Sequence, residues 1–278
     1  MLTMSCSNND FEAGHMTDET GAASQTEEFT RLQENILKLN DGWRKTNPQA
    51  ITRDDDDNER GAIVSAADVA GFSRGSKFNF MAGVAIGAAC SLVAYLVSDD
   101  DDYTASIDWE GVKRNDWVLA NNGKTATAID SAGFFHNEII LNIGKEKLSK
   151  ATVNDVEQLV VESAVELYGN DAQIPTIDEM KHDEGLRFIK ANIGRLNASS
   201  TPTAYCTILG ESNSFNKQEL GIVQVYLNGL QTIDNTNGNY TKAVLNEIDN
   251  ANLSPKTIVN LRANILLGNA SNKLWTGR

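Results

Sequence analysis

Histidines are the side chains best suited to acid–base chemistry near neutral pH, and the chain has three: His15, His136 and His182. His136 is followed by Asn137 and Glu138. A functional interpretation makes His136 and Glu138 metal ligands or the acid–base pair of a hydrolase. A structural interpretation has His136 and Asn137 bracing the start of a helix through side-chain hydrogen bonds. We favour the second, because residues two apart point to different sides of a helix.

Motifs that usually mark catalytic or metal sites do not occur in the sequence. Residues 182–184 read His-Asp-Glu but lack the second histidine of the zinc-protease motif. There is no nucleophile elbow, P-loop or dinucleotide-binding fingerprint. Cys6, Cys90 and Cys206 form no Cys-x-x-Cys pair, and a Cys90–Cys206 disulfide stays open. We predict no metal and no cofactor, and we favour a non-enzymatic role.

An apolar segment, Phe78 to Val97, stands out from the rest of the chain. Arg74 and Lys77 precede it, and the run Asp99 to Asp102 follows it. Its uncharged part, Met81 to Val97, has 17 residues, at the lower edge of the roughly 17–25 that span a bilayer. Cations before it and aspartates after it fit a span whose N-terminus lies inside.

Small residues recur every four positions through this region: Gly71, Gly75, Gly83, Gly87 and Ser91. Asn79 is the one larger residue in this row. Residues four apart share a helix face, so the row lets another helix approach closely, as small residues do inside membranes. Three interpretations stay open: a membrane span, the buried central hairpin of a soluble bundle, and a segment that inserts on oligomerisation. A lipid on Cys6 would make a second membrane anchor less necessary, so we favour the row of small residues as a close-packing face over a lipid-facing surface.

The chain as a whole is acidic, with 278 residues, a formal net charge of −14 and a pI of about 4.6. This charge argues against nucleic acid as a partner, because phosphate binding needs a basic face, and it disfavours adhesion to anionic lipid. The runs Asp54 to Asp57 and Asp99 to Asp102 are typical of solvated loops. Hydrophobic residues make up 41%, so a packed core is feasible.

The first residues, Leu2 to Cys6, precede a polar stretch rich in Ser, Asn, Asp and Glu. They resemble the lipobox of bacterial lipoproteins, which implies lipidation at Cys6 and a membrane contact there. No basic region and no full apolar region precede Cys6. The prediction of an outer-membrane lipoprotein or secreted protein therefore requires that the given start lies inside the true signal. Otherwise the protein is cytoplasmic.

The hydrophobic pattern predicts a mainly α fold: a helical bundle with a glycine-rich apolar helix or hairpin, a long irregular connection and a disordered N-terminal tether. A short amphipathic helix is expected over 27–40, an acidic linker over 41–60, and one or two helices over 62–97. The predicted parts are a tether (1–26), an N-terminal helical part (27–98), an irregular connection (99–135) and a C-terminal helical domain (136–278).

Helix boundaries in the C-terminal part follow from capping signals. Thr152 or Asn154 is expected to start a helix that Gly169 ends. Thr176 is expected to cap one helix running to Ile193, and Ser254-Pro255 predicts the start of the last helix. A cluster of aromatic residues in and beside the connection either pins it to the core or lines a groove: Tyr103, Trp109, Trp117, Phe134 and Phe135.

Three stretches resemble an uncharacterised family of envelope or secreted proteins from Bacteroides-type bacteria: residues 66–71, 135–138 and 248–254. The resemblance covers roughly residue 27 to the end and implies an envelope location and a helical fold, but no catalytic residue. The Ala-Asp-x-x-Gly row also resembles the glycine-rich helical hairpins of bacteriocin-like peptides.

These observations lead to one main hypothesis and two alternatives. The main hypothesis is a lipid-anchored or secreted helical protein of the cell envelope, which works by interaction with a membrane and with a possible protein partner. The first alternative is a bacteriocin-like or pore-forming protein in which residues 78–97 insert into a target bilayer. The weaker alternative is a hydrolase that uses His136.

Overall fold

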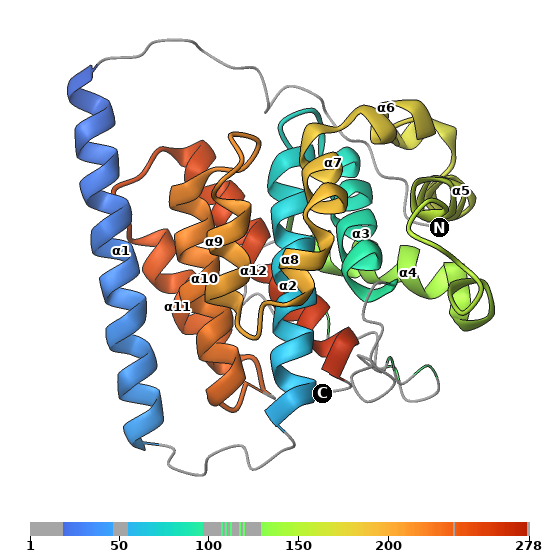
Figure 1. Cartoon of the computed structure of the whole chain (residues 1–278). Helices are drawn as coiled ribbons and strands as arrows, with labels where there is room; N and C mark the ends of the chain where they lie inside the picture. The colour runs from blue at the N-terminus through green and yellow to red at the C-terminus, as the bar shows by residue number, and fades with distance from the viewer. Residues whose placement is uncertain are drawn as a thin grey trace.

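The protein is described by a computed structural model that covers residues 19–46, 55–96, 107, 109, 112, 117, 119, 129–235 and 237–276. Every regular element in these ranges is a helix (Figure 1), which confirms the mainly α prediction. Cys6, His15, Tyr103 and the run Asp99 to Asp102 lie outside the described residues. The longer helices are α1 (Glu19–Thr46), α2 (Asp55–Gly75), α3 (Phe80–Leu96), α4 (Ala132–Leu148), α5 (Val156–Tyr168), α10 (Lys217–Thr232), α11 (Asn239–Asp249) and α12 (Pro255–Thr276).

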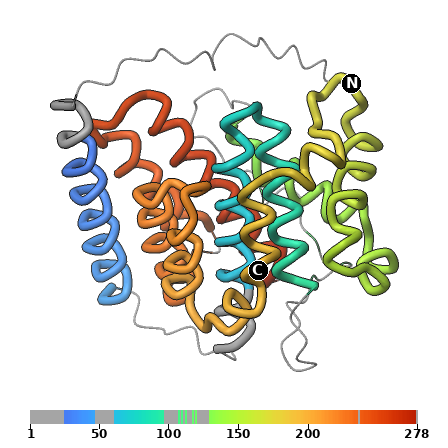
Figure 2. The backbone as a smooth tube through the Cα atoms, turned by 45° about the horizontal axis from the view of Figure 1, so that its top comes forward, coloured from blue at the N-terminus to red at the C-terminus, as the bar shows by residue number. Residues whose placement is uncertain are grey.

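Shorter helices complete the bundle: the 3₁₀ turns η3 (Ile129–Ser131) and η4 (Asn170–Ala172), with α6 (Ile177–His182), α7 (Glu184–Ala191), α8 (Ile193–Asn197) and α9 (Pro202–Leu209). Helices α2 and α3 form a hairpin in the middle of the molecule (Figures 1 and 2). On one side α12 and α10 pack against α2, and α1 covers α10 and α11. On the other side α4, α5 and α7 pack against α3. One hydrophobic core therefore joins residues of the ranges 27–98 and 136–278.

The α2–α3 hairpin turns at residues 76–79. Helix α2 ends at Gly75, and the Asn79 side chain accepts a hydrogen bond from the backbone N–H of Ala82 at 2.7 Å. Asn79 thus caps α3, which explains why a polar residue interrupts the row of small ones. Thirteen residues of α3 are buried, from Ala82 to Ala94. No helix in the described part of the chain combines the length and the apolar character needed to cross a bilayer.

Helix α1 is longer than the pattern over 27–40 predicted, and the expected linker over 41–60 is helical at both ends. The C-terminal extension of α1 has two physical causes. Trp43 packs edge-on against Tyr240, with 6.3 Å between ring centroids. Arg44 and Lys45 lie in the last turn, where cations interact favourably with the helix dipole.

The predicted boundaries of the C-terminal helices are only partly right. Thr176 caps α6 in a capping box with Glu179, Gly169 follows α5 with a φ of 78°, and Ser254 accepts from the backbone of Thr257 at 3.2 Å. The single helix from Thr176 to Ile193 is wrong, because Asp183 adopts an extended backbone and separates α6 from α7. The start at Thr152 or Asn154 is also wrong, because Asp155 occupies the position before α5.

The two cysteines in the described residues are free thiols, so they form no disulfide. The Cys90 side chain packs against Gly71 between the two helices of the hairpin. Burial, followed by the charge of Asp183, raises the pKa of the Cys90 thiol well above its ordinary value. Burial raises the pKa of Cys206 to about 12. Both behave as small apolar side chains rather than as nucleophiles.

The aromatic residues beside the irregular connection pack onto the helical core. Trp117 is buried, and its ring lies 6.0 Å from that of Phe134. Phe135 is also buried and contacts Tyr168 edge-on at 5.2 Å. This packing matches the pinning interpretation.

Candidate functional site

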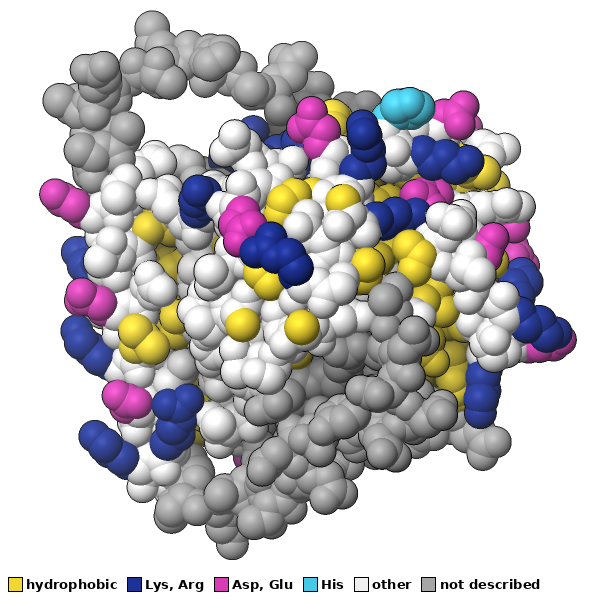
Figure 3. Space-filling model, viewed as in Figure 1, with side chains coloured by type: hydrophobic (Ala, Val, Ile, Leu, Met, Phe, Trp, Pro, Cys, Tyr) yellow, Lys and Arg dark blue, Asp and Glu magenta, His cyan; other side chains and the backbone are white. Residues whose placement is uncertain are grey.

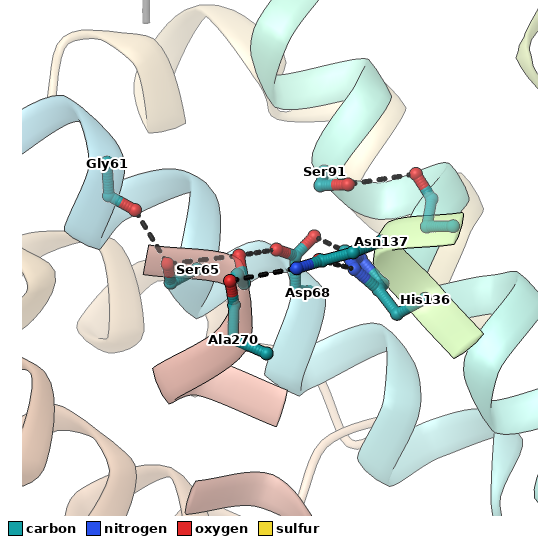
Figure 4. A network of polar contacts seen from close by, with 9 residues as sticks. Gly61, Ser65, Asp68, Ser91, His136, Asn137 and Ala270 are labelled. Atoms are coloured by element: carbon teal, nitrogen blue, oxygen red, sulfur yellow. Dashed lines mark hydrogen bonds and ion pairs between the residues drawn. The ribbon is translucent and has the colours of Figure 1, made fainter. Parts of the chain in front are cut away.

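Polar side chains from three helices meet in one buried network in the middle of the bundle (Figure 4). Ser65 and Asp68 come from α2, His136 and Asn137 from α4, and Ser271 from α12. All five side chains are fully enclosed, each with a relative exposure of 0%. Since buried charged groups are costly unless they are paired, the network must satisfy itself internally.

Small residues allow the helices to come close enough for these short side chains to meet. A Cβ atom on Gly133 of α4 would collide with Ala270 of α12, and one on Gly61 of α2 would collide with Thr276. On the α3 side, a Cβ on Gly87 would lie 3.0 Å from the Asp68 carbonyl oxygen. Helices α3 and α12 therefore both lie close to α2, and α4 lies close to α12.

Asn137 fixes the hydrogen positions on His136. Its Nδ2 donates to the carbonyl oxygen of Ala270 at 2.9 Å, so its Oδ1 faces His136 Nδ1 at 2.9 Å. Because Oδ1 can only accept, Nδ1 carries a hydrogen. The other ring nitrogen, Nε2, lies 3.1 Å from Asp68 Oδ1. The two atoms form an ion pair, although the ring N–H direction is not that of a well-aligned hydrogen bond.

The far side of Asp68 is held by two serines. Ser271 donates to Asp68 Oδ2 and lies 3.1 Å from the Ser65 hydroxyl. Ser65 in turn donates to the carbonyl oxygen of Gly61 at 2.7 Å. The network thus runs from α4 through α2 to α12.

The pKa of His136 is raised above its ordinary value. Burial has the largest effect and by itself would lower this pKa, because it disfavours the charged ring. The charge and contact of Asp68, together with Asn137, oppose burial and outweigh it. This direction favours the charged form of His136.

The geometry gives the hydrolase hypothesis no support. Both His136 nitrogens face protein groups, and Ser271 contacts the carboxylate rather than the imidazole, so neither serine of the network is placed for activation by the histidine. His136 lies within α4, at its fifth residue, so the expected place at a helix start is wrong. Among the described residues, no group of three His, Cys, Asp or Glu side chains is arranged to hold a metal.

The other predicted site residues lie outside the network. Glu138 is half-buried on the neighbouring face of α4. Ser91 is buried and donates to the Ala88 carbonyl oxygen at 3.0 Å within α3. The four glycines lie at the contact between α2 and α3, where each added Cβ atom would meet the opposite helix: Gly71, Gly75, Gly83 and Gly87.

Sequence reasoning missed Asp68, Ser65 and Ser271 as members of a site. The available signal was Asp68, the one charged residue between Gly61 and Arg74, in a stretch of small and apolar residues. A lone carboxylate on an apolar helix face predicts a buried partner. Nothing local indicated that the partner is His136.

A second buried network joins α1, α10, α11 and α12. The rings of Tyr226 and Tyr240 stack at 5.6 Å with an interplanar angle of 9°. The Tyr240 hydroxyl donates to Asn40 of α1 at 2.8 Å, and the Tyr226 hydroxyl lies 2.8 Å from Thr241. Thr241 then donates to Asn269 of α12 at 3.1 Å. Helix α12 therefore supplies neighbouring residues to both networks.

Two of the three stretches behind the family resemblance, residues 66–71 and 135–138, meet at Asp68 and His136. The third, residues 248–254, lies elsewhere, where the backbone N–H of Asn252 donates to Glu28 at 2.7 Å. The family assignment itself stays a prediction. No protein-family model, no curated protein and no solved structure matches this chain.

Proposed function

We propose that the chain is a non-catalytic helical interaction protein of the cell envelope, attached by a lipid on Cys6 or secreted. One observation carries the non-catalytic part: the network with the groups best suited to chemistry, Asp68 and His136, is fully enclosed and joins helices to one another. A protein built in this way offers partners its surface rather than a reaction centre.

The surface fits a role in interaction better than permanent membrane burial. The face in Figure 3 carries lysine, arginine and acidic side chains with scattered apolar groups between them. Among the described residues, the large apolar side chains classed as exposed are Leu37 and Phe78, at 48% and 64%. Isolated apolar residues of this kind are ordinary on soluble surfaces, so a partner would bind through a mixed polar interface.

The envelope location is tested by lipid labelling of the protein expressed from its own gene with the natural upstream DNA. We expect an alkyne-bearing fatty acid to label the protein and to carry it into the detergent phase. The Cys6→Ser variant should lose the label, whereas Ser7→Ala should keep it. A native protein that is neither labelled nor exported would reject the envelope location.

One observation favours a second candidate, a membrane-active protein. Helix α3 is apolar on all sides and is covered by α2, α4, α5 and α7. An all-round apolar helix is typical of buried or membrane environments, so the opening of the bundle would release a segment that can enter a bilayer.

This candidate predicts that the purified protein releases a trapped dye from lipid vesicles. Leakage should increase under conditions that open the bundle, such as acid or mild heating. Neutral and anionic vesicles should be compared, because the net charge of −14 disfavours anionic lipid. No leakage from either vesicle at any protein concentration would reject a membrane-active role.

A further inference from the structure

A small cavity lies between α2, α10 and α12, apart from the two networks described above. Its volume is about 10 Å³, which is close to the room that one water molecule needs. Most of its walls are apolar, and four polar side chains reach it: Ser73, Asn216, Glu219 and Asn264.

Asn264 is the unusual member of this group. Its relative exposure is 1%, and neither its amide nitrogen nor its amide oxygen has a partner at ordinary hydrogen-bond distance and angle, although the side chain lies near enough to the Glu219 carboxylate to lower the pKa of that group. Buried amides of folded proteins nearly always have a partner. A fully buried amide without a well-formed hydrogen bond, at the wall of a cavity, indicates that the cavity supplies a further partner.

Glu219 lies on the same cavity and is largely held by protein groups. Its Oε2 accepts from Ser73 at 2.8 Å, and its Oε1 accepts from Asn216 at 3.1 Å. Each carboxylate oxygen has a further lone pair. Burial raises the pKa of Glu219, while the hydrogen bond from Ser73, the charge of Lys77, the hydrogen bond from Asn216 and a weaker contact with the Asn264 side chain partly oppose the rise. A further donor in the cavity would therefore find an acceptor on Glu219.

We propose that one internal water molecule occupies this cavity and bridges Asn264 to Glu219. The water donates one hydrogen to the carboxylate and pairs with the Asn264 amide through its other hydrogen or its lone pair. A metal ion fits less well, because hard cations require several oxygen ligands and both Glu219 oxygens already accept from protein donors. The bridge connects α10 to α12.

The proposal is tested by nuclear Overhauser contacts between water and the Asn264 side-chain amide in the native protein. We expect cross-peaks whose sign shows a water that stays bound for longer than molecular tumbling. These cross-peaks should disappear in Asn264→Leu, which fills part of the site with an apolar side chain. They should remain in Asn246→Leu, which makes the same change on the exposed face of α11.

The native spectrum decides the question even where Asn264→Leu does not fold. Absence of a long-lived water contact at Asn264 would overturn the proposal. A crystal structure after a rubidium soak distinguishes a water molecule from a monovalent cation in the cavity. Anomalous density there would show a cation and overturn the proposal, whereas ordinary water density within hydrogen-bond distance of both Asn264 and Glu219 would support the bridge.

Discussion

Asp68→Ala is expected to lower the free energy of unfolding by about 3–5 kcal/mol, as the removal of one partner from a buried ion pair typically does. The substitution leaves the His136 ring and the Ser271 hydroxyl without the group that they face. Urea denaturation at neutral pH measures the loss. The matched control is Asp41→Ala on α1, where the carboxylate is 66% exposed and lies 3.6 Å from Arg44. This control should cost less than about 1 kcal/mol.

The same ion pair sets the direction of a pH effect. The pKa of His136 in the folded protein is raised above the value of 6.5 of an unfolded chain. The folded state therefore binds this proton more tightly, and its contribution to stability is complete below pH 6.5. That contribution is lost as the pH rises through the folded-state pKa.

The pH effect is measured as the difference in the free energy of unfolding between the native protein and the His136→Gln variant, which has no titrating ring at this position. The native free energy of unfolding should fall relative to the variant as the pH rises above 6.5. If the native protein instead became more stable relative to the variant as the pH rose, His136 would be neutral in the folded protein.

For the first prediction, equal losses in the free energy of unfolding for Asp68→Ala and Asp41→Ala would show that the network contributes no more than a surface pair.

Gly71→Ala is the second substitution with a large expected effect, a loss of about 2 kcal/mol, within the usual range for overpacking. The new Cβ atom would lie 2.7 Å from the Ile86 carbonyl oxygen and 2.9 Å from the Cα of Gly87. Both are backbone atoms of α3, so the helix itself must move. The higher helix propensity of alanine offsets only about 1 kcal/mol.

The matched control is Gly42→Ala in α1, where nothing lies within 4 Å of the added atom. There the substitution should stabilise the protein by roughly 0.5–1 kcal/mol, because only the helix propensity changes. Chemical denaturation of both variants gives effects of opposite sign if α2 and α3 are packed as described. Stabilisation by both substitutions would contradict the close contact at Gly71.

Helix ends that depend on residues close together in the chain can be predicted from the sequence. The capping box at Thr176 and the Ser254-Pro255 start depend on residues three or fewer positions apart, so their pattern can be read directly. The helix break at Asp183 has a local signal of the same kind, because the Asp183 side chain caps α7 by accepting from the backbone N–H of Leu186 at 2.9 Å. The other partner of Asp183 could not be read in this way: Arg74 of α2 donates to its carboxylate at 3.1 Å from 109 positions away.

The candidate site was predicted only in part for the same reason. His136 and Asn137 stood out as polar residues before an apolar run, and they do take part in hydrogen bonding. Their partners, Asp68 and the Ala270 carbonyl, belong to helices that only the folded chain brings together. A buried pairing across 133 positions, as between Asn137 and Ala270, leaves no periodic signal in the sequence.

Helix α12 also implies an order of events during synthesis. It follows every helix that it joins, and its neighbouring residues Asn269, Ala270 and Ser271 complete two separate networks. Ribosomes add about 5–20 residues per second, so the residues of α2 and α3 are made roughly 9–35 s before their polar partners on α12. During that interval Asp68 lacks its Ser271 partner and the finished bundle cannot form. Closure of the interior therefore follows the synthesis of α12.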